Sequence, residues 1–322
     1  MVRFGIIGTG SITDKFLEAA TQAAGFQLAA VYSRSEEKGR DFAARYGCSR
    51  VCTSLEELAA SKEIDAVYVA SPNSFHCAQS IQMMDGGKHV LCEKPVASDS
   101  KELERMLDAS ARNKVVFLEA MRSVFDPGFA KLQELLPRIG KVRSASFVYC
   151  QYSSRYDKFK EGVVLNAFNP ALSNAALMDI GVYCVHPMVQ LFGMPEKISS
   201  DSIFLENGME GAGSVIAGYD GMQAVLQYSK ISNSGLPSQI QGEEGTLVIR
   251  EITDIREIQL HRKKKETEVF AIGKKSNNMY YEIQRFIELI ENGEDAGVHN
   301  KFSWMEMKVM DEVRRISGIK FL

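Results

Sequence analysis

The stretch Val2-Arg3-Phe4-Gly5-Ile6-Ile7-Gly8-Thr9-Gly10-Ser11-Ile12-Thr13 decides the fold that this sequence predicts. Its first six residues are mostly apolar, as expected of a strand in a parallel sheet that is covered on both faces. Gly8 and Gly10 match the first two glycines of a dinucleotide fingerprint, with Thr13 in the third place. Gly8 permits a tight turn, and Gly10 lets the start of the next helix, Ser11 and Ile12, approach a pyrophosphate.

Strands and helices alternate from this stretch to about residue 122. Apolar strands are predicted at Phe26–Tyr32, around Val51, at Ile64–Ala70 and at Val115–Glu119, with helices at about 36–46, from Ser54, and at about 75–85 and 100–113. We take Ser98 or Ser100 as the N-cap of the last of these helices. The series predicts a Rossmann-type domain over residues 1–122.

The end of the second strand bears on the choice of dinucleotide. An NAD site would place an acidic residue about 20 residues beyond the fingerprint, but this sequence has Ser33-Arg34-Ser35 there. A guanidinium between two hydroxyl groups suits a 2′-phosphate, because guanidinium and phosphate form strong, charge-assisted hydrogen bonds. We therefore expect NADP rather than NAD. The alternative is that Arg34 is a solvated loop residue.

Another predicted strand ends in a tripeptide that holds a lysine in place. The segment Gly87–Pro95 is a short apolar strand that ends in Glu93-Lys94-Pro95. Pro95 ends the strand because it lacks a backbone donor and restricts the residue before it. Lys94 is therefore held at the carboxyl end of a strand, the edge of an open α/β sheet at which ligands bind.

The second half of the chain has strands without intervening helices. After a helix at about 128–136, strands are predicted at Val142–Tyr149, Ile198–Leu205, Ser214–Tyr219, Met222–Tyr228, Leu247–Ile249, Ile255–His261 and Glu266–Ile272. Asp220-Gly221 predicts a type I′ hairpin, and 232–235 and 242–245 predict turns. The chain is thus α/β, with a Rossmann-type parallel sheet followed by an α+β domain, residues 123–322, with a large, mainly antiparallel open sheet. The last helices, about 279–292 and 303–316, could pack back on the first domain.

One helix of this half carries several polar residues. The polar stretch 151–171, predicted to be a loop, precedes a helix from Asn174 to Pro187. Asp179 and Tyr183 are four residues apart and so share a helix face, and His186 lies on the same side. Pro187 should kink or loosen the helix.

The Gly-x-Gly, Glu-Lys-Pro and Asp179-x-Gly-x-Tyr183 segments, in this order, resemble the Gfo/Idh/MocA family of nicotinamide-dependent oxidoreductases. Many members of the family have Asp-x-x-x-His, whereas this sequence has Tyr183 in place of the histidine. In this it resembles the tyrosine-bearing branch that includes glucose-fructose oxidoreductase, dimeric dihydrodiol dehydrogenase and xylose dehydrogenases. The sequence departs from the family where Ser173-Asn174 replaces the usual Gly-Gly.

The resemblance implies a set of cofactor contacts. Lys94 would act beside the nicotinamide, and Arg122, in a Met-Arg-x-x-Phe-x-Pro turn, would face the cleft. The remaining residues that the resemblance places around the nicotinamide and ribose are Ser71, Pro72, Asn73, His76 and Glu93. The alternatives are that His76 makes only a local hydrogen bond at a helix start and that Arg122 forms a structural salt bridge.

The resemblance also implies a mechanism. Hydride transfer from a carbinol requires removal of the hydroxyl proton, and a nearby ammonium group favours the phenolate form of a tyrosine. We expect Tyr183 to be the acid/base, Lys94 to hydrogen-bond the reacting oxygen, and Asp179 to orient Lys94 or a substrate hydroxyl. Arg155, Asn166 and His186 are further candidate substrate contacts, although His186 is better explained as a satisfied core histidine. Tyr183 bonded to backbone and Asp179 as a helix-dipole partner are the structural alternatives.

These residues predict an NAD(P)-dependent oxidoreductase of a secondary alcohol or carbonyl in a sugar, polyol or cyclic diol. One alternative is a dinucleotide-binding sensor or regulator without turnover. Such a protein would be expected to lose the lysine or the acid/base residue, but this chain has both Lys94 and Tyr183. The other alternative is a reductase of an imine or double bond.

Composition limits the partners. The net charge of −3 gives no basic field for nucleic acid or a membrane surface, and we attribute the cationic run His261–Lys265 to a solvated strand end. We expect no apolar run that approaches the ~20 residues of a membrane span. The six cysteines lack zinc-ligand spacing, so we expect no metal and a reduced, cytoplasmic protein with small core cysteines. The open sheet predicts a homodimer or higher oligomer.

Overall fold

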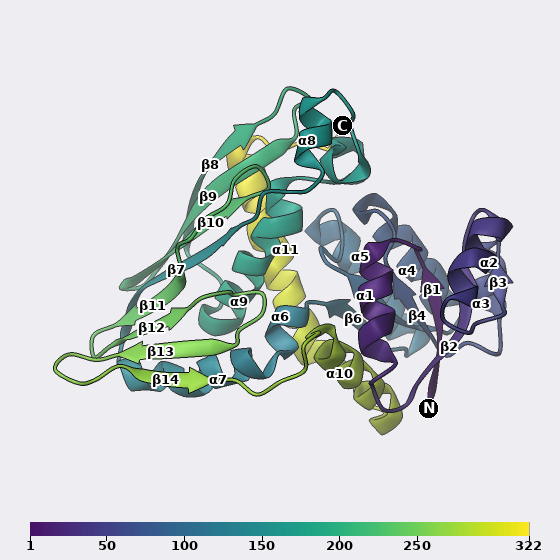
Figure 1. Ribbon diagram of the computed structural model, residues 1–322, viewed down its shortest axis with the longest axis horizontal. Coiled ribbons are helices and arrows are strands. Elements are labelled where there is room, and N and C mark those ends of the chain that lie inside the picture. Colours follow the sequence, from purple (N-terminus) through teal and green to yellow (C-terminus); the bar gives the residue numbers. More distant parts are fainter. Residues whose placement is uncertain (322) are drawn as a thin grey trace. The chain divides into compact units, whose positions relative to one another are not determined.

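The computed structural model describes residues 1–321 of the 322, and they form two compact units (Figure 1). Unit 1 contains residues 1–121 and 275–304, and unit 2 contains residues 122–274 and 305–322. The candidate functional residues fall in both units. Each unit is therefore described by itself.

Unit 1 is a parallel sheet of six strands in the order β3-β2-β1-β4-β5-β6. The strands are β1 (Val2–Ile7), β2 (Phe26–Tyr32), β3 (Val51–Cys52), β4 (Ala66–Val69), β5 (His89–Glu93) and β6 (Phe117–Ala120). The helices are α1 (Ser11–Ala20), α2 (Glu36–Ala44), α3 (Leu55–Ala60), the 3₁₀ turn η1 (Asn73–Phe75), α4 (His76–Asp85), α5 (Ser100–Asn113), α10 (Met279–Asn292) and the start of α11 (Gly297–Ser317). This order confirms the predicted Rossmann fold and reverses between β1 and β4, where such sheets bind ligands.

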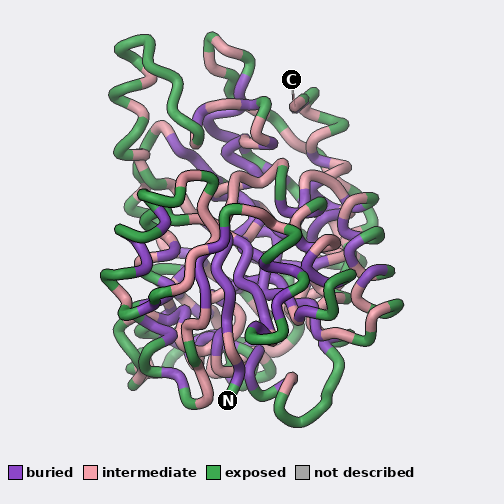
Figure 2. The backbone as a smooth tube through the Cα atoms, turned by 90° about the vertical axis from the view of Figure 1, so that its right-hand side faces the viewer, coloured by how far each residue is buried: buried purple, intermediate pink, exposed green. Residues whose placement is uncertain are grey.

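The strands of unit 1 are apolar because helices cover both faces of the sheet. All four residues of β4 are buried, and Figure 2 shows the strands of this unit largely in purple. Helix α10 packs against α1, β1 and β6, and its Phe286 ring lies 5.9 Å from the ring of Phe4. The end of the chain thus contributes a helix to the first sheet.

The N-cap of α5 differs from the prediction. Asp99, not Ser98 or Ser100, caps this helix, because its carboxylate accepts a hydrogen bond from the Glu102 amide at 2.8 Å. Ser100 is the first residue of the helix. Aspartate is as good an N-cap as serine, so three candidate caps in a row left the boundary open to a one-residue error.

Unit 2 is an eight-stranded sheet in the order β14-β13-β12-β11-β7-β10-β9-β8. Its strands are β7 (Val142–Cys150), β8 (Lys197–Phe204), β9 (Glu210–Tyr219), β10 (Met222–Ser229), β11 (Ser238–Gly242), β12 (Thr246–Ile249), β13 (Glu257–His261) and β14 (Glu268–Ala271). Only β7 and β10 pair in parallel, so the mainly antiparallel sheet is confirmed. Strand β11 was missed because Ser-Gln-Ile-Gln-Gly has a single apolar residue and lies between two turn signals.

The hairpin at Asp220-Gly221 is present, but its turn is not type I′. Tyr219 pairs with Met222, which leaves a two-residue loop as predicted. A type I′ turn needs positive φ at both loop residues. Here Gly221 has a φ of 69°, whereas Asp220 is not among the residues with positive φ.

The first helix of unit 2 starts at residue 122, where the chain passes from unit 1 into unit 2. The helices of unit 2 are α6 (Arg122–Phe125), α7 (Pro127–Leu135), the 3₁₀ turn η2 (Leu136–Ile139), α8 (Tyr156–Lys160), the 3₁₀ turns η3 (Asn166–Phe168) and η4 (Pro170–Leu172), the π-helical turn η5 (Leu177–Gly181), α9 (Val182–Phe192) and the rest of α11. The predicted loop 151–171 therefore contains short helices. The helix was predicted to loosen at Pro187. Instead, the irregular part is the π-helical turn Leu177–Gly181, and Pro187 lies inside the regular helix α9.

The helical span Pro170–Phe192 is long and apolar enough to cross a membrane by length and composition alone. No such run was predicted from the sequence, although Asn174 and Asp179 are isolated polar residues within the span. This span packs on β7, β9 and β10, and 78% of its most apolar window is buried inside the structure. The core helix of a soluble protein passes the same test, so the span is weak evidence for a membrane.

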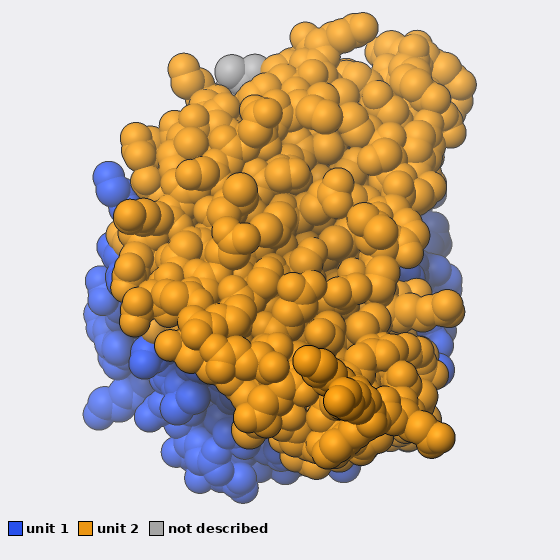
Figure 3. Space-filling view, turned by 90° about the vertical axis from the view of Figure 1, so that its left-hand side faces the viewer, with its two compact units in different colours: residues 1–121, 275–304 blue, residues 122–274, 305–322 orange. Residues whose placement is uncertain are grey.

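The sheet of unit 2 presents one broad face, seen in orange in Figure 3. Apolar side chains are exposed on its strands: Ile203 is 60% exposed, Phe204 43% and Ile216 48%. The cationic run ends β13 at His261 and continues as an exposed turn through Lys263–Lys265, as expected of a solvated strand end. Five of the six cysteines are buried, which confirms their prediction as small core residues.

A buried carboxylate holds the π-helical turn. Glu210 of β9 is fully buried and accepts hydrogen bonds from the Leu177 amide at 2.7 Å and from the Tyr228 and Ser202 hydroxyls at 2.9 Å. Burial raises the pKa of Glu210 to about 7, against these hydrogen bonds. The first residue of η5 is therefore tied to the sheet by a group that titrates near neutrality.

The raised pKa of Glu210 predicts a pH-dependent stability. In the unfolded chain the Glu210 carboxyl ionises near pH 4.5, whereas in the folded chain it holds its proton up to about pH 7. Its contribution to the free energy of unfolding is therefore complete below pH 4.5 and is lost as the pH rises through about 7. Each pKa unit corresponds to about 1.4 kcal/mol, so the loss should reach a few kcal/mol. Urea unfolding from pH 5 to pH 8 should show this slope in the wild type and in the exposed control Glu206→Gln. Glu210→Gln should flatten it, and an unchanged slope in that variant would contradict the assignment.

Candidate active site

The fingerprint turn of unit 1 brings two backbones together. Gly8 has a φ of +107°, and a Cβ there would lie 2.4 Å from the Ala70 carbonyl oxygen at the end of β4. Only glycine fits both the conformation and the space. Thr13, in the third glycine place, is completely buried and donates a hydrogen bond from its hydroxyl to the Gly8 carbonyl at 2.9 Å. The threonine therefore closes the turn with a bond instead of with close packing.

The amino end of α1 has room for a phosphate group. Gly10 is the N-cap, with φ −90° and ψ 178°, and because glycine has no side chain, no side-chain hydrogen bond caps the helix. A Cβ at Gly10 would meet nothing within 4 Å. Ser11 and Ile12 follow as the first helical residues, whose amides point out of the helix start. An open position beside free amides is what a pyrophosphate at a helix N-terminus requires, so the residues present fit a dinucleotide.

The end of β2 carries an available cation. Ser35 caps α2 by accepting from the Lys38 amide at 3.4 Å, and Ser33 accepts from the Ser35 amide at 3.3 Å. Arg34 between them is exposed and, within residues 1–321, forms no ion pair with an acidic side chain. The local hydrogen bonds thus fix the loop while leaving the guanidinium accessible to an anion.

His76 links the ends of two neighbouring strands. Its buried ring lies 2.8 Å from the Ser71 carbonyl oxygen, after β4, and 3.0 Å from that of Pro95, after β5. Burial lowers the pKa of His76, and the charge of Lys94 lowers it further. Pro72 and Asn73 lie half-buried between these points, at the start of η1. The ring therefore lies between the two strand ends, and a neutral imidazole donates a hydrogen bond to one of the two carbonyl oxygens.

The Glu-Lys-Pro segment places a buried acid before a half-buried lysine. The Glu93 carboxylate accepts a hydrogen bond from the Tyr68 hydroxyl at 2.5 Å, and the Tyr68 ring stacks on Phe16 at 3.7 Å. Burial and Glu93 raise the pKa of Tyr68 well above its usual value. Glu93 is thus fixed in the core of unit 1, and Lys94 is the residue of the tripeptide whose side chain remains partly accessible.

In unit 2, Tyr183 is bound by a cation. Arg122, the first residue of α6, donates from Nε to the Tyr183 hydroxyl at 3.3 Å, and its guanidinium carbon lies 5.4 Å from the ring centre. Tyr149 of β7 meets the same ring edge-on at 5.5 Å. Tyr183 is only 6% exposed, so its phenol is held by contacts from α6 and β7.

Asp179 has a different partner that the sequence analysis missed. Its Oδ2 lies 2.9 Å from the Nζ of Lys230, whose side chain is 2% exposed, while that of Asp179 is 36% exposed. Lys230 follows β10, and the usual interpretation of a lysine after a strand is a solvated end. No signal in the sequence linked it to Asp179, because the two are distant along the chain.

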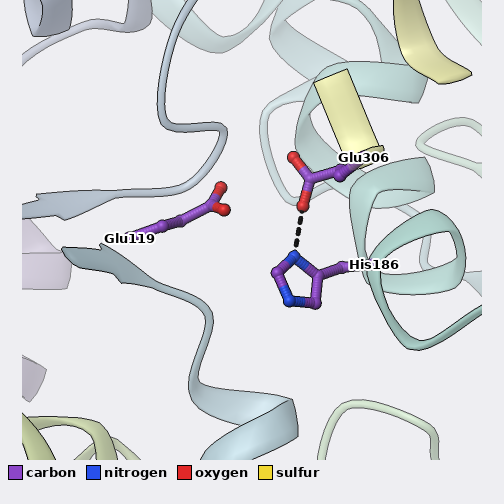
Figure 4. A group of neighbouring side chains, drawn as sticks. All are labelled: Glu119, His186 and Glu306. Atoms are coloured by element: carbon purple, nitrogen blue, oxygen red, sulfur yellow. Dashed lines mark hydrogen bonds and ion pairs between the residues drawn. The ribbon is translucent and has the colours of Figure 1, made fainter. Parts of the chain in front are cut away.

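The other predicted substrate contacts are dispersed within unit 2. His186 is buried, and its Nδ1 lies 2.6 Å from the Glu306 carboxylate of α11, the dashed line of Figure 4. Arg155 and Asn166 are exposed on the loop before η4. The Asn166 carbonyl accepts a hydrogen bond from the Asn174 side chain at 2.7 Å, which connects this loop to the residues that precede the π-helical turn.

Comparison with known proteins places both halves of the chain in one family. A model described as oxidoreductase family, NAD-binding Rossmann fold, GFO_IDH_MocA, matches residues 2–121, and the GFO/IDH/MocA C-terminal domain matches residues 129–248. These matches confirm the resemblance found in the sequence.

Similar proteins include characterised enzymes. A scyllo-inositol 2-dehydrogenase (NADP(+)) of Bacillus subtilis (strain 168) is 47% identical, with 100% of this chain and 98% of that protein aligned. A trans-1,2-dihydrobenzene-1,2-diol dehydrogenase of Xenopus laevis is 31% identical, over 77% of this chain and 74% of that protein. A crystal structure of a 3-ketoreductase from Actinomadura kijaniata, with NADP and TDP-benzene, has a TM-score of 0.89 at 20% identity and covers 98% of each chain. That likeness supports the fold.

The open position at Gly10 gives a direct test of cofactor binding. Gly10→Ala should leave the melting temperature unchanged, because φ is ordinary and no atom is near. It should weaken NADPH binding about tenfold or more, some 1.4 kcal/mol, because the methyl group would occupy the space for phosphate. Fluorescence titration with NADPH measures this, with Gly235→Ala as a control at an equally open position. Unchanged affinity would show that the phosphates bind elsewhere.

Proposed function

The chain belongs to the Gfo/Idh/MocA family of NAD(P)-dependent oxidoreductases acting on CH–OH groups, and on that premise we propose that it interconverts a cyclic polyol and its ketone with NADP. One observation carries this proposal: a short helical segment of unit 2 presents a phenol and a carboxylate, each next to a fixed cation. A phenol suits proton transfer at the reacting carbinol, and a carboxylate suits a neighbouring hydroxyl group. The similarity to a scyllo-inositol 2-dehydrogenase over the whole chain supports a polyol as substrate.

The bound nicotinamide would supply the hydride chemistry, and the protein would supply position and a proton path. Gly8, Gly10, Ser11 and Ile12 would hold the pyrophosphate. Ser33 and Arg34 would bind the 2′-phosphate, which supports NADP over NAD. The residues that would surround the nicotinamide and its ribose are Ser71, Pro72, Asn73, His76, Glu93, Lys94 and Arg122.

Three residues would act on the substrate in this proposal. Tyr183 takes the hydroxyl proton as hydride leaves, or returns it in the reduction. Lys94 donates a hydrogen bond to the same substrate oxygen. Asp179 accepts a hydrogen bond from a neighbouring hydroxyl, and Arg155, Asn166 and His186 are further candidate contacts on unit 2. Proton transfer by a positioned side chain typically contributes about 10²–10⁴-fold to the rate.

The exposed apolar strand residues of unit 2 support a homodimer or higher oligomer formed through the open sheet. The modest negative charge supports a partner that is neither nucleic acid nor a membrane surface. Reduced, buried cysteines agree with a cytoplasmic location. The change of unit at residue 122 supports separate cofactor and substrate domains, with residues 275–304 of the last helices joining the first unit.

Removal of the two reacting groups tests the mechanism. Tyr183→Phe and Lys94→Met should each lower kcat about 10²–10⁴-fold for oxidation of inositols by NADP, with little change in the Kd for NADPH. Tyr219→Phe, which removes a phenol bonded to the Gly193 carbonyl, is the matched control and should keep full activity. Near-normal turnover in both reacting-group variants would refute the assignment. An inactive wild type that still binds NADPH would favour a sensor.

The choice of cofactor depends on Arg34 in this proposal. Arg34→Ala should lower kcat/KM for NADP about 10- to 100-fold, the range for loss of hydrogen bonds to a charged group, and leave the value for NAD almost unchanged. Arg40→Ala removes another exposed arginine, which pairs with Glu36, and it should not alter the ratio. Steady-state kinetics with both cofactors decide the matter. A ratio that is the same in Arg34→Ala and wild type would contradict the role.

A further inference from the structure

We propose that Lys230 is a positioning residue that fixes Asp179, and that the Lys230–Asp179 pair selects substrates with a hydroxyl group next to the reacting carbon. This inference rests on the proposed function and adds a residue to it. Lys230 lies at the end of β10 and is 1% exposed. It is therefore in a position to act through Asp179 but not to contact a substrate itself.

The ammonium group of Lys230 has three contacts that share one feature: each belongs to a segment with a candidate substrate residue. Its Nζ lies 2.9 Å from Asp179 Oδ2 in the π-helical turn. It donates a hydrogen bond to the Ala167 carbonyl at 2.6 Å and lies 4.9 Å from the centre of the Phe168 ring. Ala167 and Phe168 belong to η3, which begins with Asn166.

The backbone of Lys230 is fixed on both sides. Its amide donates to the Gly211 carbonyl at 2.9 Å, and its own carbonyl accepts from the Ser153 amide at 2.8 Å. The side chain therefore extends from a rigid point of the sheet. Because the donor is fixed, the carboxylate that it binds has a defined position as well, although Asp179 is partly open to solvent.

Stability alone does not explain a lysine at this place. Taking an ammonium group out of water costs several kcal/mol, and a buried ion pair often stabilises a fold no better than apolar residues of the same volume. Asp179 is also in a π-helical turn, a distortion that is frequent at functional sites. A fixed, partly accessible carboxylate in such a turn is suited to accepting hydrogen bonds from a ligand hydroxyl.

The same lysine joins Asp179 to the aromatic part of the loop. The ring of Phe168 stacks with Tyr156 at 5.6 Å and with Phe159 at 5.5 Å. Tyr183, in contrast, is held by Arg122 and Tyr149. Loss of Lys230 should therefore disturb recognition of the neighbouring hydroxyl, while Phe168 keeps its stacking partners in the loop and the proton-transfer group keeps its own contacts.

The test compares substrates that differ only in the neighbouring hydroxyl. Lys230→Met should raise KM for scyllo-inositol and for trans-1,2-cyclohexanediol about 10- to 100-fold, the range for a hydrogen bond to a charged group, and change kcat by less than about threefold. Kinetic constants for cyclohexanol, which has a single hydroxyl group, should stay the same. Lys230→Arg should restore most of the affinity, and Lys197→Met, at an exposed lysine of β8, should have no effect.

A double-mutant cycle guards against a variant that is merely misfolded. In an Asp179→Asn background, Lys230→Met should add almost nothing to KM, because the group that it positions is already lost. Equal losses for the diols and cyclohexanol, or additive effects in the cycle, would overturn the inference. If the wild type oxidises none of these alcohols, the proposed function fails. If the wild type is active and Lys230→Met has the wild-type KM ratio, only the role of Lys230 fails.

Discussion

The hydrogen bond from the Leu177 amide to the buried Glu210 carboxylate is the constraint on which the arrangement of unit 2 depends. It ties the first residue of the π-helical turn to strand β9 and so anchors the start of the helical segment that continues into α9. Two other residues of the sheet region also hold side chains of this helical segment in place: Lys230 binds Asp179, and Tyr149 contacts Tyr183. The polar residues of the helix are therefore oriented by the sheet and not by helix geometry alone, which is how a precise site is held.

Unit 1 achieves the same end with strand termini. Pro95 follows the end of β5, and the buried ring of His76 lies within hydrogen-bonding distance of the carbonyl groups of Ser71 and Pro95 and donates to one of them. Glu93 is fixed by Tyr68, so Lys94 extends from a backbone that is held on both sides. Position is the protein's main contribution to hydride transfer, because the redox chemistry belongs to the nicotinamide.

The fold of both units followed from the sequence because apolar periodicity and glycine-containing turns are local signals. The Rossmann order, the mainly antiparallel sheet and the Asp220-Gly221 hairpin were all predicted from such signals. Long-range polar pairs were not, and Lys230 and Glu210 were missed because nothing near them in sequence reveals their partners. Strand β11 and the Asp99 cap failed for a related reason: where local preferences are weak or nearly equal, tertiary packing decides. The apolar span Pro170–Phe192 was underestimated because burial in a core tolerates isolated polar residues that have partners.

The central claim is that an amine from a strand end and a phenol from a helix act on one substrate oxygen. A crystal structure of the protein with NADP and scyllo-inositol measures this directly. We predict that Lys94 Nζ and Tyr183 Oη both lie within hydrogen-bonding distance, about 3.2 Å or less, of the oxygen on the carbon that faces the nicotinamide. Binding of the two groups to different substrate oxygens, or of only one of them to the substrate, would contradict it.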